Sequence, residues 1–197
     1  ITGQALEGKN DIYPPLSITA KQLKAINYTL PVASAQVKSA ILFAGLFAEG
    51  TTCITEPIAC RNHSEVMLKT FGAAITQENT KISINGSKEL KNPFNSPITI
   101  PADFSSAAFF IVLGLISNNT EITITNVGLN PTRATLLNVL QDMGADITIK
   151  QKEGIEPFGD ITVKSSKLTN IAVAAADIAF IIDEIPILAV AGMFAEG

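Results

Sequence analysis

Apolar and small residues dominate the stretch from Leu30 to Gly50, and polar residues mark its start. Pro31 cannot lie inside a helix and Ser34 is a favourable N-cap, so we predict a helix that begins after Ser34. Nearly every residue from Val37 to Ala48 is apolar or small, which indicates a helix buried on almost all sides. The free N–H groups of its first turn, at residues 34–36, offer a site for an anion such as phosphate, but most capped helices bind nothing.

The remaining pattern alternates between the periods of strands and helices. Residues 1–30 are irregular and strand-rich, with turn and proline signals that break them up. After the first helix we predict strand 51–55, a helix from Asn62 to about Phe71, strands 73–77 and 81–85, loop 92–96, strand 98–100, helix 107–116, strand 121–126, helix 134–143, strands 145–150 and 160–164, and helix 187–195.

This order repeats along the chain at nearly constant spacing. Arg61 and Arg133 are 72 residues apart, and so are the helix-ending Gly72 and Gly144, whereas Ser34 and Asp103 are 69 residues apart. The string Phe-Ala-Glu-Gly occurs at residues 47–50 and again at 194–197, at the end of a third copy that begins near Asp183. Such spacing predicts an α/β (α+β) fold built from copies of one supersecondary unit.

The third copy stops after its first helix, which leads us to expect a piece of a longer protein. We place an approximate domain boundary near Pro101, between the first two copies, giving domains 1–101 and 102–197.

The composition of the chain argues against several classes of protein. The longest apolar stretch, residues 107–116, has ten residues, too few to cross a membrane, and no signal peptide begins the chain. A net charge of −4 with no Trp and no basic stripe disfavours nucleic-acid binding. Two cysteines and one histidine make a disulfide framework or a zinc site improbable. We therefore expect a cytoplasmic protein that holds any anion with few cations, since Arg61 and Arg133 are its only arginines.

Four strings resemble EPSP synthase, and together they extend over nearly the whole chain. They are Leu-Pro-Val-Ala-Ser-Ala-Gln-Val-Lys-Ser-Ala-Ile-Leu at 30–42, Ile-Thr-Glu-Pro at 54–57 with Arg-Asn-His-Ser-Glu at 61–65, Leu-Asn-Pro-Thr-Arg at 129–133, and Ile-Asp-Glu-Ile-Pro-Ile-Leu-Ala-Val-Ala at 182–191. The resemblance implies two domains of repeated β-α-β-α-β-β units. It also implies transfer of the enolpyruvyl group of phosphoenolpyruvate to the 5-hydroxyl of shikimate 3-phosphate, with release of phosphate. It implies no metal or organic cofactor, and a monomer when full length.

The resemblance also assigns roles to five residues. Ser34, Ala35 and Gln36 match the turn that binds the shikimate 3-phosphate, and Gln36 matches the residue that also reaches phosphoenolpyruvate. Arg61 matches a basic residue at the same phosphate, where a guanidinium can bind two oxygens at once. Asp183 matches the catalytic carboxylate that contacts the 5-hydroxyl and accepts its proton. Its sequence position before Glu-Ile-Pro is equally typical of a helix N-cap.

Four other residues receive structural interpretations. We expect the Lys38 ammonium to reach water and His63 to be a partly exposed residue at a helix start. Asp103 should only cap its helix, because a carboxylate repels an anion. A structural role is favoured for Arg133, although it is the repeat equivalent of a predicted ligand residue.

Parts of the family pattern lie outside these 197 residues. A Lys-Ser motif and an arginine should precede this segment, and a Lys-Glu-Ser-x-Arg motif should follow it, so we expect the chain alone to be inactive. Two other hypotheses stay open: an enolpyruvyl transferase acting on UDP-N-acetylglucosamine, and a non-catalytic ligand-binding repeat module.

Overall fold

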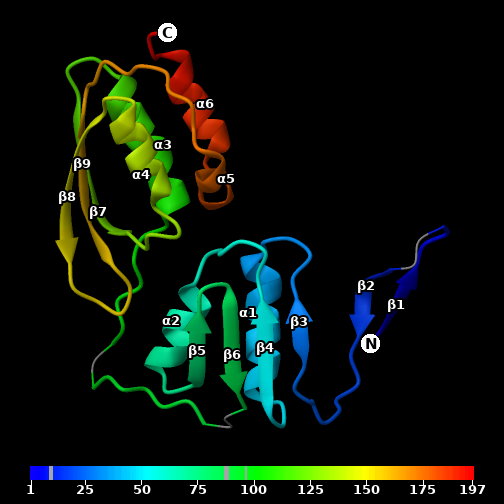
Figure 1. Cartoon of the computed structure of the whole chain (residues 1–197). Helices are drawn as coiled ribbons and strands as arrows, with labels where there is room; N and C mark the ends of the chain where they lie inside the picture. The colour runs from blue at the N-terminus through cyan, green and yellow to red at the C-terminus, as the bar shows by residue number, and fades with distance from the viewer. Residues whose placement is uncertain (9–10, 87–88, 96) are drawn as a thin grey trace.

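The computed structural model describes residues 1–8, 11–86, 89–95 and 97–197, which form nine strands and six helices in their described parts. The elements follow one another along the chain as Figure 1 shows. They are β1 (Thr2–Ala5), β2 (Ile12–Ser17), β3 (Asn27–Thr29), α1 (Ala35–Leu46), β4 (Thr51–Thr55), α2 (His63–Thr70), β5 (Ala74–Glu78), β6 (Lys81–Asn85), α3 (Phe104–Ile116), β7 (Glu121–Gly128), α4 (Thr135–Asp142), β8 (Asp146–Lys152), β9 (Phe158–Lys164), α5 (Ala175–Ile181) and α6 (Ile185–Met193).

Two sheets share one topology, which confirms the repeated α/β fold. The first sheet has the strand order β3-β4-β6-β5, and the second has β7-β9-β8. In the first sheet β6 pairs antiparallel with both β4 and β5. In the second sheet β9 pairs in the same way with β7 and β8. The elements β3 to β6 form a complete β-α-β-α-β-β unit. In the second unit the first strand is reduced to a parallel bridge between Ala102 and Val127.

The third copy is recognisable by its helix end. The backbone N–H groups of Phe47 and Ala48 donate to the carbonyls of Ala44 and Gly45. Those of Phe194 and Ala195 donate to the equivalent carbonyls of Ala191 and Gly192. Both Phe-Ala-Glu-Gly strings then make an isolated parallel bridge through their glutamate. The two strings therefore end equivalent helices, as the repeat predicts.

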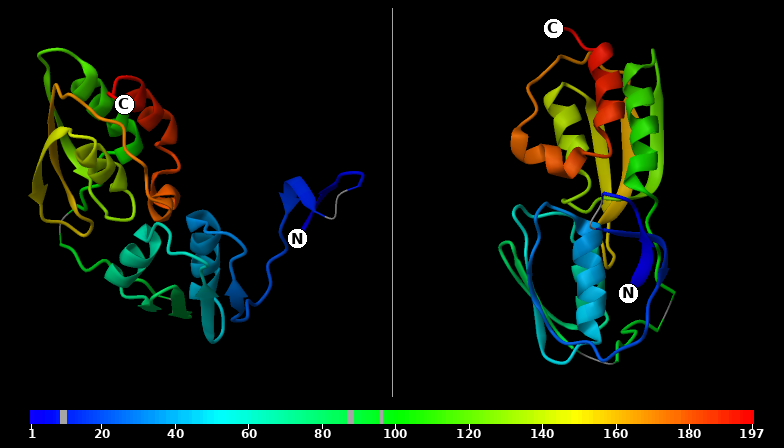
Figure 2. Two further views of the ribbon diagram at one scale, coloured as in Figure 1. Left: turned by 45° about the horizontal axis from the view of Figure 1, so that its top comes forward. Right: turned by 90° about the vertical axis from the view of Figure 1, so that its right-hand side faces the viewer.

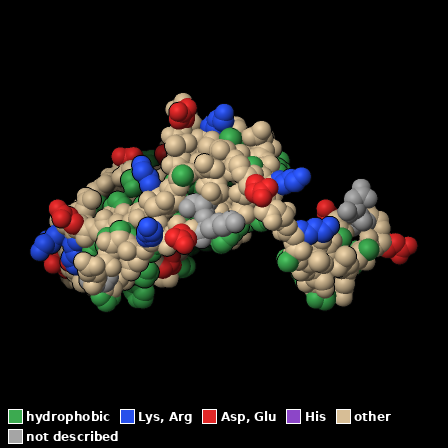
Figure 3. All heavy atoms as spheres, turned by 90° about the horizontal axis from the view of Figure 1, so that it is seen from below, with side chains coloured by type: hydrophobic (Ala, Val, Ile, Leu, Met, Phe, Trp, Pro, Cys, Tyr) green, Lys and Arg blue, Asp and Glu red, His purple; other side chains and the backbone are tan. Residues whose placement is uncertain are grey.

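Each sheet packs against its own helices and encloses a separate set of buried side chains (Figure 2). The N-terminal core consists of Leu30, Leu42, Leu46, Ile54, Leu68, Ala73, Ile75, Ile82 and Ile84. We use "C-terminal core" for the buried side chains between Phe104 and Ala191, which come mainly from α3, α4, β7 and β9. The β1–β2 hairpin stands apart from both, as the space-filling view shows (Figure 3).

A glycine brings each first helix close to its sheet. A Cβ added at Gly45 would lie 2.8 Å from Ile84 Cγ2, and one added at Gly114 would lie 2.5 Å from Val163 Cγ2. The third equivalent, Gly192, has only Asn170 Oδ1 near that position, at 3.4 Å. The first two copies therefore contain a helix–sheet contact that the third copy lacks here.

Most predicted elements are present, with three differences. Residues 98–100 form no strand, because no neighbouring strand pairs with them. The helix α5 was missed, since its alanine-rich sequence has no distinct cap signal. The prediction that α1 is buried on nearly all sides is wrong, because Val37 and Phe43 are 43% and 51% exposed. No helix in the described part of the chain is long and apolar enough to cross a membrane.

Candidate functional site

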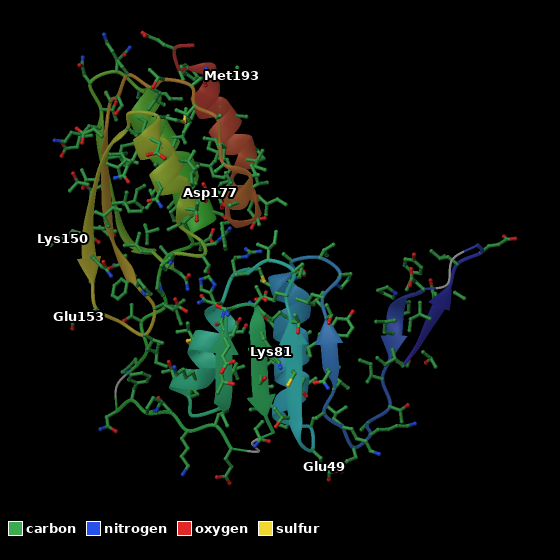
Figure 4. All side chains as sticks on the ribbon, viewed as in Figure 1. Glu49, Lys81, Lys150, Glu153, Asp177 and Met193 are labelled. Atoms are coloured by element: carbon green, nitrogen blue, oxygen red, sulfur yellow. The ribbon has the colours of Figure 1, made fainter. Side chains whose placement is uncertain are left out.

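A pocket of about 730 Å³ lies between the two cores. Its walls come from the first turn of α1, the start of α2, the connecting residues 100–104 and the β8–β9 loop. Both arginines of the chain and its single histidine line this pocket. In Figure 4, side chains of both cores meet where the upper ends of α1 and α2 face the lower ends of α3 and α4. The two guanidinium groups of the chain are thus gathered in one place.

The α1 N-terminus forms one wall of the pocket through Ala35 and Gln36, whereas Ser34 does not line it. Ser34 has an extended backbone and its hydroxyl accepts a hydrogen bond from the Val37 N–H at 3.3 Å, which confirms it as the N-cap. Ala35 and Gln36 line the pocket, and the Gln36 side chain is exposed. The Ser39 hydroxyl, one turn further on, lies 2.6 Å from that of Ser64 and joins α1 to α2. Free N–H groups at this helix start are available to an anion.

Asp183 joins the two cores through arginine. Its Oδ2 lies 3.0 Å from Arg61 Nη1 and 3.1 Å from Arg133 Nη1, although Asp183 itself does not line the pocket. The N-cap of α6 is Glu184 rather than Asp183, and it makes no side-chain capping bond. The capping interpretation of Asp183 is therefore wrong, because the carboxylate pairs with two guanidinium groups instead.

Arg133 has the structural contacts that were favoured for it. The Glu184 side chain is 1% exposed, and its Oε1 lies 3.2 Å from Arg133 Nη1. The same Oε1 accepts a hydrogen bond from the Ser105 hydroxyl at 2.5 Å, and that hydroxyl also contacts Arg133. This buried group fixes Arg133 at the edge of the pocket.

A second, smaller junction lies beside Arg61. The Asn62 side-chain oxygen accepts hydrogen bonds from Asn130 Nδ2 at 2.9 Å and from the Thr132 hydroxyl at 3.3 Å. Asn130 is buried and also donates to Glu156 Oε2 at 2.8 Å. Two successive residues, Arg61 and Asn62, therefore each contact a polar residue of the C-terminal half of the chain.

The Lys38 side chain is buried rather than directed to water, contrary to expectation. Its ammonium is 0% exposed and lies 2.6 Å from Glu65 Oε1 and 3.1 Å from Glu56 Oε1. Burial alone lowers the pKa of Lys38, but contact with Glu65 and the charges of Glu65 and Glu56 outweigh it and raise the pKa. Snorkelling was the wrong prediction because two acidic residues from later segments surround the ammonium.

Two further residues agree with their predictions. Asp103 caps α3 by accepting from the Ser106 N–H at 2.8 Å. Desolvation raises its pKa, but the Ser106 and Ser105 hydrogen bonds and the Arg133 charge outweigh this and leave the pKa below its ordinary value. His63 is exposed at the first position of α2.

The site also contains residues that sequence reasoning missed. Two contacts join segments that are far apart in the sequence. The Ser105–Glu184 contact beside Arg133 spans 79 residues, and the Asn62–Asn130 contact spans 68 residues. The one signal for them was the matching spacing of Arg61 and Arg133, which indicated that both arginines occupy equivalent places.

Comparison with known proteins agrees with this architecture. The family model described as EPSP synthase (3-phosphoshikimate 1-carboxyvinyltransferase) matches residues 2–197. The chain belongs to the EPSP synthase family. Two relatives named 3-phosphoshikimate 1-carboxyvinyltransferase, from Geobacillus thermodenitrificans and Geobacillus kaustophilus, are 48% and 49% identical over 99% and 97% of this chain.

Solved structures give the same family. An EPSP synthase from Acinetobacter baumannii is 43% identical, with a TM-score of 0.84, over 100% of this chain and 44% of that one. The enolpyruvyl transferase NikO from Streptomyces tendae, at 20% identity and a TM-score of 0.65, shares the fold. The chain spans about 45% of the length of the EPSP synthase relatives that it matches.

Proposed function

We propose that this chain is part of an enzyme that transfers the enolpyruvyl group of phosphoenolpyruvate to the 5-hydroxyl of shikimate 3-phosphate. Membership of the EPSP synthase family supports this reaction. The observation that carries the site is that Gln36 and Arg61, both expected at the sugar phosphate, line one pocket. Asp183 lies within 3.0 Å of Arg61. The proposal includes a domain boundary near Pro101. It also includes a cytoplasmic location, since phosphorylated substrates do not cross membranes unaided.

In this proposal the substrate phosphate binds at the start of α1, where N–H groups and the Gln36 amide are donors. Arg61 binds the same phosphate with two hydrogen bonds, which are stronger than those of a neutral donor. Its guanidinium then turns from Asp183 toward the phosphate. Arg133 keeps its positive charge 3.1 Å from the Asp183 carboxylate when Arg61 turns away.

Asp183 accepts the proton of the 5-hydroxyl as that oxygen bonds to C2 of phosphoenolpyruvate, while the double-bond pair takes up a proton at C3 from an acid in the family motifs outside these 197 residues. Loss of a C3 proton and of phosphate from this tetrahedral adduct then restores the double bond. Its Oδ2 contacts both arginines, whereas Oδ1 makes no hydrogen bond with the described part of the chain. That oxygen is the one available to a hydroxyl. The remaining charged donors expected for phosphoenolpyruvate belong to family motifs outside these 197 residues.

The test of the binding site is calorimetric titration of shikimate 3-phosphate into the 197-residue chain and its variants. Gln36→Ala with Arg61→Ala should weaken binding by at least about 100-fold, because each lost hydrogen bond to a charged group contributes about 1.5–3 kcal/mol. The matched control is Gln141→Ala with Lys150→Ala, which removes an amide and a cation from exposed positions outside the pocket. Equal affinity of the two double variants contradicts the assignment, and preference for UDP-N-acetylglucosamine would favour the other transferase.

The test of the reaction replaces the matching region of the Geobacillus thermodenitrificans relative with this chain. We expect this chimera to release phosphate from the two substrates, and Asp183→Asn to lower its rate at least 100-fold with little change in shikimate 3-phosphate affinity. A chimera that binds both substrates without releasing phosphate would leave the non-catalytic module as the better description.

A further inference from the structure

A closed cluster of charged side chains lies directly behind the pocket wall. Lys38, Glu56 and Glu65 are at most 5% exposed, and Cys60 is 8% exposed. Lys38 comes from α1, Glu56 and Cys60 from the loop between β4 and α2, and Glu65 from α2 itself. No part of the proposed reaction uses these residues, and Lys38 is the only cation that contacts the two glutamates among the described residues.

The Lys38 ammonium connects three segments. It forms ion pairs with Glu65 Oε1 at 2.6 Å and Glu56 Oε1 at 3.1 Å, and it donates a hydrogen bond to the Cys60 carbonyl oxygen at 3.4 Å. The Cys60 thiol in turn donates to Glu56 Oε1 at 2.6 Å. The Cys60 carbonyl belongs to the peptide bond that joins Cys60 to Arg61. One buried cation therefore holds the backbone from which Arg61 projects.

The other end of this connection is the start of α1. Lys38 lies two residues after Gln36, and its backbone N–H donates to the Ser34 carbonyl at 3.0 Å in the first hydrogen bond of the helix. The cluster thus links the segment carrying Gln36 to the segment carrying Arg61 through a path inside the protein. The polar ends of both side chains lie outside this cluster, where Arg61 pairs with Asp183.

The charges of the cluster do not balance. One ammonium faces two carboxylates, and Glu56 Oε2 and both Glu65 oxygens have no well-directed hydrogen bond in the described structure. Replacing buried ionic groups with apolar side chains is often neutral or stabilising. Stability alone is therefore a poor explanation for this arrangement, whereas fixed geometry of a binding site depends on such supporting contacts.

We propose that Lys38 is a positioning residue, which sets the spacing between Gln36 and Arg61 by holding Glu65, Glu56 and the Cys60 carbonyl together. This inference rests on the proposed function for its ligand, shikimate 3-phosphate. Its mechanical part, a rigid connection between the starts of α1 and α2, does not depend on the ligand.

The first experiment measures amide hydrogen exchange in the whole 197-residue chain. In Lys38→Met, the amides of residues 37, 38 and 66, which form the first hydrogen bonds of α1 and α2, should exchange at least tenfold faster than in the unmodified chain. Residues 42–46 at the far end of α1 should change less than threefold. Lys164→Met, which breaks an exposed ion pair with Glu121, is the matched control and should change neither set. Uniform acceleration across α1, or none, overturns the proposal.

The second experiment separates positioning from stability. A triple variant, Lys38→Met with Glu56→Gln and Glu65→Leu, removes every charge of the cluster, and we expect it to fold with a melting temperature near that of the unmodified chain. It should still bind shikimate 3-phosphate at least tenfold more weakly, because no group holds the Cys60 carbonyl. The single variant Lys38→Arg keeps the cation and both glutamates. It should therefore bind shikimate 3-phosphate more tightly than the triple variant.

The outcomes distinguish the two proposals. Undiminished affinity in a stably folded triple variant shows that the cluster is only structural and overturns the positioning role. If the unmodified chain itself does not bind shikimate 3-phosphate, the proposed ligand fails, while the exchange rates still decide whether Lys38 fixes the two helix starts.

Discussion

Two carboxylates contact the same nitrogen of Arg133 at almost the same distance, yet they should contribute unequally to stability. Glu184 lies 3.2 Å and Asp183 3.1 Å from Arg133 Nη1, but their side chains are 1% and 45% exposed. The perturbation is the pair of single variants Glu184→Gln and Asp183→Asn, which remove charge and keep size.

The magnitude follows from burial. At an effective dielectric constant of about 20, unit charges near 3.2 Å attract by about 5 kcal/mol before desolvation is subtracted. Breaking a buried ion pair costs about 3–5 kcal/mol, and because Arg133 keeps Asp183 as a partner we expect about 2–3 kcal/mol for Glu184→Gln. Solvent screening limits the loss for Asp183→Asn to about 1 kcal/mol.

The assay is urea unfolding monitored through the amide exchange rates of α3 and β9. These rates measure the stability of the C-terminal core by itself. Exchange of core amides reports the free energy of opening for that core, even where the two cores do not unfold together. A destabilisation by Asp183→Asn equal to or greater than that of Glu184→Gln would refute the reasoning that burial, rather than distance, decides the contribution.

Three further predictions concern single positions. Gly45→Ala should lower the free energy of unfolding by about 1–3 kcal/mol because its Cβ would overlap the sheet, whereas Gly192→Ala should raise it by up to about 1 kcal/mol in the same chemical denaturation assay. Burial raises the pKa of the Cys60 thiol to about 11, so iodoacetamide at pH 8 should modify Cys53 first, and faster labelling of Cys60 in peptide mass spectra would contradict this. Because the pKa of Asp103 is lowered on folding, the ionised side chain stabilises the folded state above about pH 4, and this stabilisation is lost as the pH falls through the folded-state pKa. Asp103→Ala should therefore lower the free energy of unfolding by about 1 kcal/mol at pH 7 and by progressively less in acid.

The repeat and the helix caps were predictable because both depend on local sequence. Ser34 and Asp103 occupy equivalent cap positions, and each does what its side chain and its spacing to the next turn predict. The strand hairpin 73–85 was equally local, since turn residues and alternating side chains specify it. Local rules therefore gave most of the fold.

The site contacts were not predictable in the same way. The burial of Lys38 depends on Glu56 and Glu65, which lie 18 and 27 residues further along the chain. The pairing of Asp183 depends on Arg61, 122 residues away, and no capping rule includes that partner. The family resemblance identified candidate ligand residues, but only the folded arrangement identifies the groups that hold them.

The segment that joins the two cores is also a wall of the pocket. Residues 100–104 line it, and Ala102 bridges to Val127 at the edge of the second sheet. A ligand that fills the pocket would lie against the covalent connection itself, so the length and conformation of this connection help to set the shape of the site. Lengthening this connection by inserted glycines should weaken ligand binding even though every side chain of the site is kept.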